Sequence, residues 1–86
     1  SMTAYSIVLI KKEGVYDPEN GRKTEYLFDD IVISEYTLVN GKKNGEWKLY
    51  HLNGEGVKII GNYKNGRQNG LFKEFDTDGK LESEYY

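Results

Sequence analysis

The dipeptide Asn-Gly occurs six times in the 86 residues of this chain, and it restricts the fold more than any other feature of the sequence. Both residues adopt positive φ at low cost, and primed hairpin turns and glycine bulges require that backbone conformation. The six pairs are Asn20-Gly21, Asn40-Gly41, Asn44-Gly45, Asn53-Gly54, Asn65-Gly66 and Asn69-Gly70. Asp78-Gly79 is a seventh corner of the same chemistry. Such regular punctuation predicts short strands joined by tight turns.

The corners recur in phase, because one pattern occurs twice at an offset of 25 residues. Asn40-Gly-Lys-Lys-Asn-Gly-Glu-Trp-Lys-Leu-Tyr50 aligns with Asn65-Gly-Arg-Gln-Asn-Gly-Leu-Phe-Lys-Glu-Phe75. The turn glycines of these two copies are Gly41, Gly45, Gly54, Gly66, Gly70 and Gly79. A degenerate upstream copy, Asn20-Gly-Arg-Lys-Thr-Glu-Tyr26, resembles the segment from Asp78 to Tyr85.

The repeat sets the expected organisation of one domain over residues 1–86. Residues 1–15 are expected to form an N-terminal strand or cap and residues 16–38 a degenerate repeat. Full repeats are expected at residues 39–62 and 63–86.

Composition supports an all-β fold, because aromatic residues make up 14% of the chain and glycine outnumbers proline ten to one. Aromatic and β-branched residues favour strands, and no stretch between the glycines has the 3.6-residue apolar period of a helix. We predict a single elongated, twisted antiparallel meander of about seven short strands. Their expected ranges are 5–11, 23–28, 31–38, 46–51, 57–63, 71–76 and 80–85.

The aromatic pairs Trp47 with Tyr50 and Phe72 with Phe75 are each spaced by three residues. In an ideal strand this spacing places the two side chains on opposite faces. Either both faces are partly covered, or a β-bulge turns both rings inward. We expect the bulge for at least part of the repeat.

The residues of the repeat resemble the MORN-repeat family in its bacterial variant form. The resemblance rests on Asn40-Gly41, Asn44-Gly45, Trp47, Tyr50 and Gly54, and on Tyr63, Asn65-Gly66, Asn69-Gly70, Phe72, Phe75 and Gly79. It implies one elongated sheet in which each repeat supplies a hairpin. It also implies a relation to bacterial antitoxin-like or immunity-like proteins. The first forty residues match this pattern poorly.

Few residues here suggest catalysis, so we expect a protein that is not an enzyme and holds no catalytic, cofactor or metal site. His51 is the only histidine, the chain has no cysteine, and none of its serines lies in a nucleophile motif. Kinase signatures are absent, although some MORN-containing proteins are associated with lipid kinases. The chain is also too short for a phosphatidylinositol-phosphate kinase domain.

Three acidic or glycine-rich segments are better explained as turns than as ligand sites. Asp76-Thr-Asp-Gly79 resembles the start of a calcium loop, but a glutamate at the twelfth position would lie beyond the chain. Asp29-Asp30 fits a two-residue turn between two strands. Gly54-Glu-Gly56 lacks the third glycine, lysine and hydroxyl of a phosphate-binding loop.

A set of aromatic side chains is the best candidate for binding a partner. A single-layer sheet cannot bury both faces, so we expect some rings to form an exposed stripe that recognises another protein. The alternative is that these rings only form the core of a thin sheet. The candidate residues are Tyr36, Trp47, Tyr50, Tyr63, Phe72 and Phe75.

Charge favours a protein partner over nucleic acid. The net charge is −2, residues 1–40 carry four basic and seven acidic side chains, and residues 41–86 carry eight and seven. Neither part has the basic excess that phosphate-backbone binding needs. Lys42, Lys43, Lys48, Lys64, Arg67 and Lys73 leave binding to a membrane surface or a phosphoinositide as an alternative. Pairing between terminal edge strands leaves a structural homo-oligomer as a third function. We expect a cytoplasmic protein, since no long apolar segment or secretion signal is found.

Overall fold

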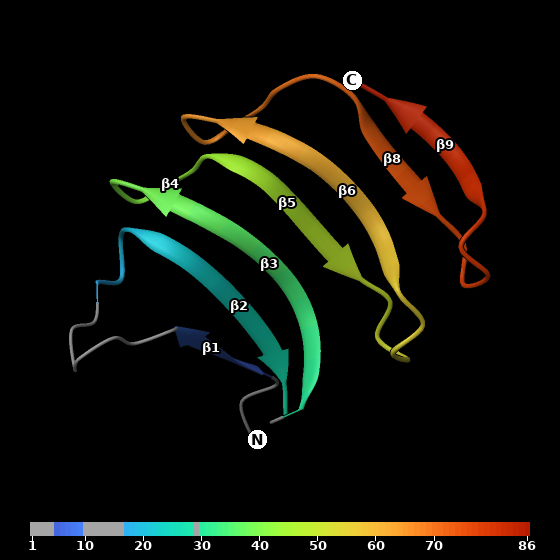
Figure 1. The fold of residues 1–86 in the computed structure, drawn as a ribbon, viewed down its shortest axis with the longest axis horizontal. Coiled ribbons are helices and arrows are strands. Elements are labelled where there is room, and N and C mark those ends of the chain that lie inside the picture. The colour runs from blue at the N-terminus through green and yellow to red at the C-terminus, as the bar shows by residue number, and fades with distance from the viewer. Residues whose placement is uncertain (1–4, 10–16, 29) are drawn as a thin grey trace.

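The computed structural model describes residues 5–9, 17–28 and 30–86, and this part of the chain is one antiparallel β-sheet without a helix. Its strands lie side by side in a single curved layer in the order β1-β2-β3-β5-β6-β8-β9, with β4 paired to β3 and β7 to β6 (Figure 1). The strands are β1 (Tyr5–Leu9), β2 (Gly21–Leu27), β3 (Ile31–Val39), β4 (Lys42–Lys43), β5 (Gly45–Tyr50), β6 (Val57–Lys64), β7 (Arg67–Gln68), β8 (Phe72–Phe75) and β9 (Leu81–Tyr85). The predicted all-β meander is therefore confirmed.

The strands outside β1 group into three hairpins, β2 with β3, β5 with β6, and β8 with β9. The short strands β4 and β7 precede the second and third hairpins and pair with the hairpin before them. Each predicted strand range overlaps an observed strand, but the short arms β4 and β7 were not predicted. Their sequences, Lys42-Lys43 and Arg67-Gln68, lack the apolar alternation that marks a strand. Tight turns hold them in the sheet.

Two of the Asn-Gly pairs form two-residue hairpin turns. Val39 pairs with Lys42 around Asn40 (φ 51°) and Gly41 (φ 80°), so both central residues have the positive φ of a type I′ turn. Asn65 and Gly66 repeat this geometry between β6 and β7, with φ of 52° and 84°. These turns return the chain after β3 and β6.

Each hairpin has a β-bulge at an equivalent place. In each hairpin, one residue of the second strand is skipped in the pairing with the first strand. These residues are Ile33 on β3, Lys58 on β6 and Glu82 on β9. A bulge bends its strand and increases the local twist. Three bulges in phase account for the arched shape of the sheet (Figure 1).

The bulges also correct the predicted phase of the first repeat. In each hairpin, the residue three positions after the bulge pairs with the residue two positions after a glycine of positive φ. These glycines are Gly21, Gly45 and Gly70. Asn20-Gly21 is therefore equivalent to Asn44-Gly45 and Asn69-Gly70. The predicted alignment of Asn20-Gly21 with Asp78-Gly79 is wrong, because the two pairs lie at opposite ends of their hairpins.

Backbone hydrogen bonds join each hairpin to the next at equivalent positions. The N–H of Gly41 donates to the carbonyl of Glu19 at 2.8 Å, and the N–H of Gly66 donates to that of Lys43 at 2.9 Å. Glu19 and Lys43 each precede one of the equivalent Asn-Gly pairs, Asn20-Gly21 and Asn44-Gly45. The type I′ turn of one hairpin is thus held by the hairpin before it.

The turn between β2 and β3 differs from the prediction. Leu27 pairs with Ile31, so the loop contains residues 28–30 and not only the pair Asp29-Asp30. Phe28 takes part in this loop with a φ of 60°. Asp29 lies outside the described residues, as do residues 1–4 and 10–15 of the predicted N-terminal strand and cap and residue 16 of the predicted degenerate repeat.

Candidate functional site

One face of the sheet carries a cross-strand row of side chains that we call the aromatic ladder. The registers Lys23↔Tyr36, Trp47↔Gly61 and Phe72↔Tyr85 lie at the same level of the three hairpins, and Tyr63 lies two residues beyond Gly61 on the same face. The ladder consists of Tyr36, Trp47, Tyr63, Phe72 and Tyr85. Four of the six predicted partner-binding residues, Tyr36, Trp47, Tyr63 and Phe72, are brought together here.

The rings of the ladder contact one another around Phe72, which is fully buried. Its ring centroid lies 5.9 Å from Trp47, 5.7 Å from Tyr63 in a T-shaped pair, and 5.8 Å from Tyr85 in a stacked pair. Gly61 makes room for this ring, because a Cβ built on Gly61 would lie 2.4 Å from it. Each such aromatic pair contributes about 0.5–1.5 kcal/mol beyond area burial.

The ammonium group of Lys43 occupies the space between three rings of the ladder. Its Nζ lies 5.1 Å from the ring centroid of Tyr36, 5.7 Å from Trp47 and 5.2 Å from Tyr63. This geometry fits cation–π interaction. Lys43 therefore belongs to the packing of the ladder, although the sequence analysis counted it among the cations that could bind a membrane surface.

Lys23 takes the ladder position that is occupied by Trp47 and Phe72 in the next two hairpins. It is 3% exposed, and its Nζ donates to the carbonyl oxygens of Asp17 and Asn20 at 2.6 Å each. The turn that supplies these carbonyls is closed by Asp17, whose carboxylate accepts from the N–H of Glu19. This backbone hydrogen bond lowers the pKa of Asp17 below its usual value of 3.8. The degenerate repeat thus replaces an aromatic ring with a lysine whose charge is hydrogen-bonded.

Tyr50 lies on the opposite face, so the expectation that a bulge turns it inward with Trp47 is wrong. The bulge is present, but its extra residue is Lys58 on β6, so the alternation along β5 is unbroken. The Tyr50 hydroxyl donates to Glu35 at 2.7 Å. Partial burial, followed by this hydrogen bond, raises the pKa of Tyr50 to about 12. Phe75 occupies the corresponding position of β8, where the extra residue is Glu82 on β9.

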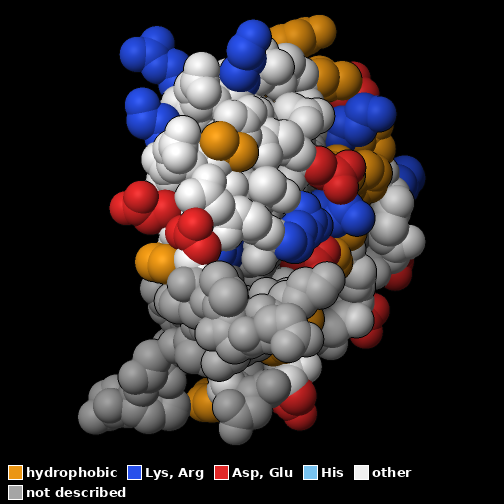
Figure 2. All heavy atoms as spheres, turned by 60° about the vertical axis from the view of Figure 1, so that its left-hand side comes forward, with side chains coloured by type: hydrophobic (Ala, Val, Ile, Leu, Met, Phe, Trp, Pro, Cys, Tyr) orange, Lys and Arg blue, Asp and Glu red, His pale blue; other side chains and the backbone are white. Residues whose placement is uncertain are grey.

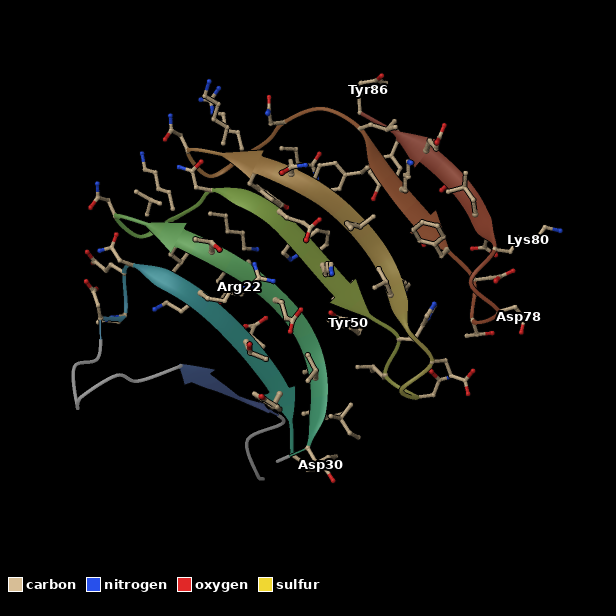
Figure 3. The ribbon with its side chains drawn as sticks, viewed as in Figure 1. Arg22, Asp30, Tyr50, Asp78, Lys80 and Tyr86 are labelled. Atoms are coloured by element: carbon tan, nitrogen blue, oxygen red, sulfur yellow. The ribbon has the colours of Figure 1, made fainter. Side chains whose placement is uncertain are left out.

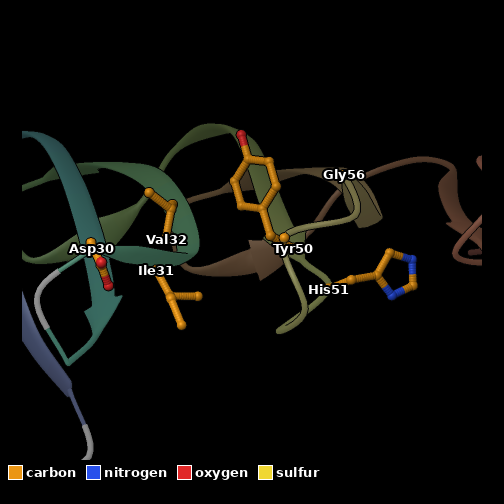
Figure 4. A pocket seen from close by; sticks show the side chains of 7 residues that line it. Asp30, Ile31, Val32, Tyr50, His51 and Gly56 are labelled. Atoms are coloured by element: carbon orange, nitrogen blue, oxygen red, sulfur yellow. The ribbon is translucent and has the colours of Figure 1, made fainter.

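An open pocket of about 300 Å³ lies where β3 and β5 separate. The two strands pair at Ser34↔Leu49 and Glu35↔Lys48, and the pairing does not extend to Ile31. Figure 4 shows β3 residues on one side and the loop after β5 on the other. The lining residues are Asp30, Ile31, Val32, Tyr50, His51, Gly54 and Gly56.

The side chain of His51 connects the loop after β5 to the loop between β8 and β9. Its Nε2 lies 3.1 Å from the carbonyl oxygen of Asp76, which starts the turn between β8 and β9. The Asp76 carboxylate accepts from the N–H groups of Asp78 and Lys80, each at 2.9 Å, and this confirms the turn interpretation of Asp76-Thr-Asp-Gly79. No cluster of three His, Asp or Glu side chains that suits a metal ion occurs in the described part of the chain.

The exposed apolar side chains lie elsewhere than predicted. Tyr36 and Phe72 are buried, and Trp47, Tyr50, Tyr63 and Phe75 are partly buried, so the expected stripe of exposed rings is not formed by these six. Among the rings whose burial the structure describes, Tyr86 is the most exposed, at 88%, and it lies beyond the end of β9 (Figure 3). Four of the exposed large apolar residues belong to the last hairpin, namely Leu71, Leu81, Tyr85 and Tyr86.

The basic side chains gather less than the sequence suggested. Lys48 lies 3.8 Å from Glu46, and Lys43 is enclosed by rings. Lys42, Lys64 and Arg67 remain at the end of the sheet with the type I′ turns, and all three are exposed. Figure 2 turns this end forward and shows several Lys and Arg side chains projecting from it.

Comparison with protein-family models, with curated proteins and with solved structures found no match. Within the described residues, no helix has the length and apolar character needed to cross a membrane.

Proposed function

We propose that this chain is a non-enzymatic, MORN-type interaction module that binds another protein through its last hairpin, β7 to β9. The observation that carries the proposal is that exposed apolar side chains concentrate on that hairpin, on both faces of the sheet. Leu81 is 45% exposed, Tyr85 38% and Tyr86 88%. Exposed apolar side chains that concentrate in one region are typical of protein-binding surfaces, and tyrosine is frequent among the residues that dominate binding energy.

The rest of the sheet supports such a role because noncovalent contacts join each hairpin to the next. The ladder, the Lys43 ammonium and the hydrogen bonds between hairpins fix the last hairpin to its neighbours. A preorganised surface loses little conformational entropy when it binds. The resemblance to bacterial antitoxin-like and immunity-like repeat proteins makes a toxin the first class of partner to test.

Site-specific photo-crosslinking tests this proposal. A photoreactive amino acid at position 85 should give a discrete adduct in cells of the source organism, whereas the same group at Thr24 on β2 should not. The captured protein is then purified, and we expect Tyr85→Ala to weaken its binding at least about ten-fold, as for a residue of a binding hot spot. An unchanged affinity, or equal adducts at both positions, contradicts the proposal.

Binding to an anionic membrane surface is a second candidate, and one corner of the sheet favours it. Lys42, Lys64 and Arg67 are exposed there, and no ion pair involving them is found among the described residues. Each cation near anionic lipid contributes about 1 kcal/mol, so the corner supplies about 3 kcal/mol. Sedimentation with phosphatidylserine vesicles at low salt tests this function, and no binding by the parent chain refutes it. Loss of binding in the triple glutamine variant would support it.

A further inference from the structure

The outer edge of β9 is unpaired within the described residues, because β9 pairs only with β8 and ends the sheet. All five of its residues are exposed. Backbone N–H and C=O groups along such an edge form a template for another strand. What kind of strand this edge accepts follows from a comparison with β3.

Strands β3 and β9 carry the same three residues at equivalent positions. Ser34-Glu35-Tyr36 and Ser83-Glu84-Tyr85 each begin one residue after the bulge, and both tyrosines belong to the ladder. In β3 the outer edge of this triplet receives β5, with Ser34↔Leu49 and Glu35↔Lys48 in register. The next residue along β5 is Trp47, which belongs to the same ladder as Tyr36.

The exposure of the two triplets differs, and the difference shows what a strand on β9 would cover. Ser34 is 2% exposed and Tyr36 8%, with β5 beside them. Tyr85 is 38% exposed and Ser83 is also exposed. Serine and tyrosine at equivalent positions of these two bulged strands are thus buried in β3 and exposed in β9.

We propose that β9 binds an extended segment with an aromatic residue, a lysine and an aliphatic residue in succession, by β-strand addition. This inference rests on the proposed function and defines the chemistry of its partner. The aromatic ring extends the ladder beside Tyr85, the lysine lies opposite Glu84, and the aliphatic residue covers Ser83. Main-chain hydrogen bonds supply affinity, and the alternating side chains supply specificity.

A second copy of this chain fits the edge less well. A symmetric antiparallel pair of β9 strands centred on Ser83 places Glu82 opposite Glu84 of the other copy, and does so twice. Like charges directly opposite each other destabilise a strand pair. The edge therefore favours a segment with a basic residue over its own duplicate.

The probe for this site is a synthetic peptide of residues 42–50 of this chain, which contains the segment that the β3 triplet receives. Titration into the isotope-labelled full chain should shift the amide signals of residues 81–85 and slow their hydrogen exchange. The matched control is the same peptide N-methylated at alternate residues of its strand, which keeps the side chains and blocks strand pairing. We expect no shifts with the control.

Charge variants test the register. Glu84→Lys should weaken binding of the peptide about two- to five-fold, the range of a cross-strand charge pair. A peptide with Lys48→Glu should recover the loss. Glu55→Lys makes the same change of charge in the loop between β5 and β6, and it should leave binding unchanged.

Three outcomes overturn the inference without touching the proposed function, which is judged by the crosslinked partner. They are shifts at other residues than 81–85, equal binding of the N-methylated peptide, and no binding of either peptide. A stable dimer in sedimentation that Glu84→Lys alters also overturns it, because a second copy would then hold the edge. Failure of both the peptide and the crosslinking experiments refutes the proposed function as well.

Discussion

Replacing Gly61 with alanine adds one methyl group against the fully buried ring of Phe72. The new Cβ would lie 2.4–2.6 Å from three ring atoms, where ordinary contact begins at 3.4 Å. The ring is held by Trp47, Tyr63 and Tyr85 and has no free direction in which to move by the missing ångström. Overpacking of this kind costs about 1–3 kcal/mol.

An opposing effect must be subtracted, because alanine restricts the unfolded chain and thereby stabilises by about 0.4–1 kcal/mol where the backbone tolerates it. Gly61 does not have a positive φ, so this gain applies. The overlap with three ring atoms places the cost near its upper end, and we expect Gly61→Ala to lower the free energy of unfolding by about 2 kcal/mol. For a domain of this size that is a fall of about 8–16 °C in Tm.

Denaturant unfolding of a double-mutant cycle with Phe72→Leu measures the contact directly. With the smaller side chain in place, the alanine should cost nothing or stabilise slightly, so the coupling should be about 2 kcal/mol. The reasoning is refuted if Gly61→Ala is as stable as the parent. It is also refuted if the alanine costs the same in both backgrounds.

Three further predictions concern substitutions of single residues. The pKa of Tyr50, raised from 10 to about 12, favours the neutral phenol in the folded state, so its stabilisation is complete below pH 10 and is lost as the pH rises to 12. Partial solvent screening reduces this loss of stability to about 1–2 kcal/mol. Tyr50→Phe cannot ionise beside Glu35, so its free energy of unfolding, measured with denaturant at each pH, should not show the loss. Parallel pH profiles of the two proteins would contradict this prediction. Lys43→Met should cost about 1–2 kcal/mol through the three lost cation–π contacts, against less than about 0.5 kcal/mol for Lys42→Met, and equal losses would show that the rings do not hold the ammonium group. Gly66→Ala should cost about 1–2 kcal/mol because its φ is 84°, and an unchanged midpoint of unfolding would exclude this strain.

The sheet and its two type I′ turns were predictable because their causes are local. Asn40 and Gly41 both adopt positive φ at low cost, so the pair by itself favours the type I′ turn that it forms. The same holds for Asn65-Gly66. Strand existence followed from aromatic and β-branched residues between the corners.

The sequence did not predict on which face of the sheet each ring lies, because this depends on which strand of a pair contains the extra residue of the β-bulge. The spacing of Trp47 and Tyr50 is the same whether the bulge lies on β5 or on β6. Only the pairing shows that Lys58 is the extra residue. Likewise, nothing around Lys23 in the sequence indicates a buried lysine, because its partners are backbone carbonyls of a turn.

One signal of the proposed binding edge was present in the sequence. The triplet Ser-Glu-Tyr occurs at residues 34–36 and again at 83–85. Its offset of 49 residues is one short of two repeats of 25, so it is out of phase with the Asn-Gly corners. The structure accounts for this difference of one residue, because the loop before β9 is one residue shorter than the loop before β6.

The way the hairpins hold one another also determines how a partner would act on the fold. In a repeat protein each unit contacts only its neighbours, so stability is a sum of units and of the interfaces between them. The first and second hairpins each lie against a following hairpin, which donates a hydrogen bond to Glu19 and to Lys43. The third has no such neighbour among the described residues and relies on Phe72 and Tyr85. A strand added to β9 would supply the missing interface, and so binding there and the stability of the last hairpin rest on the same contacts.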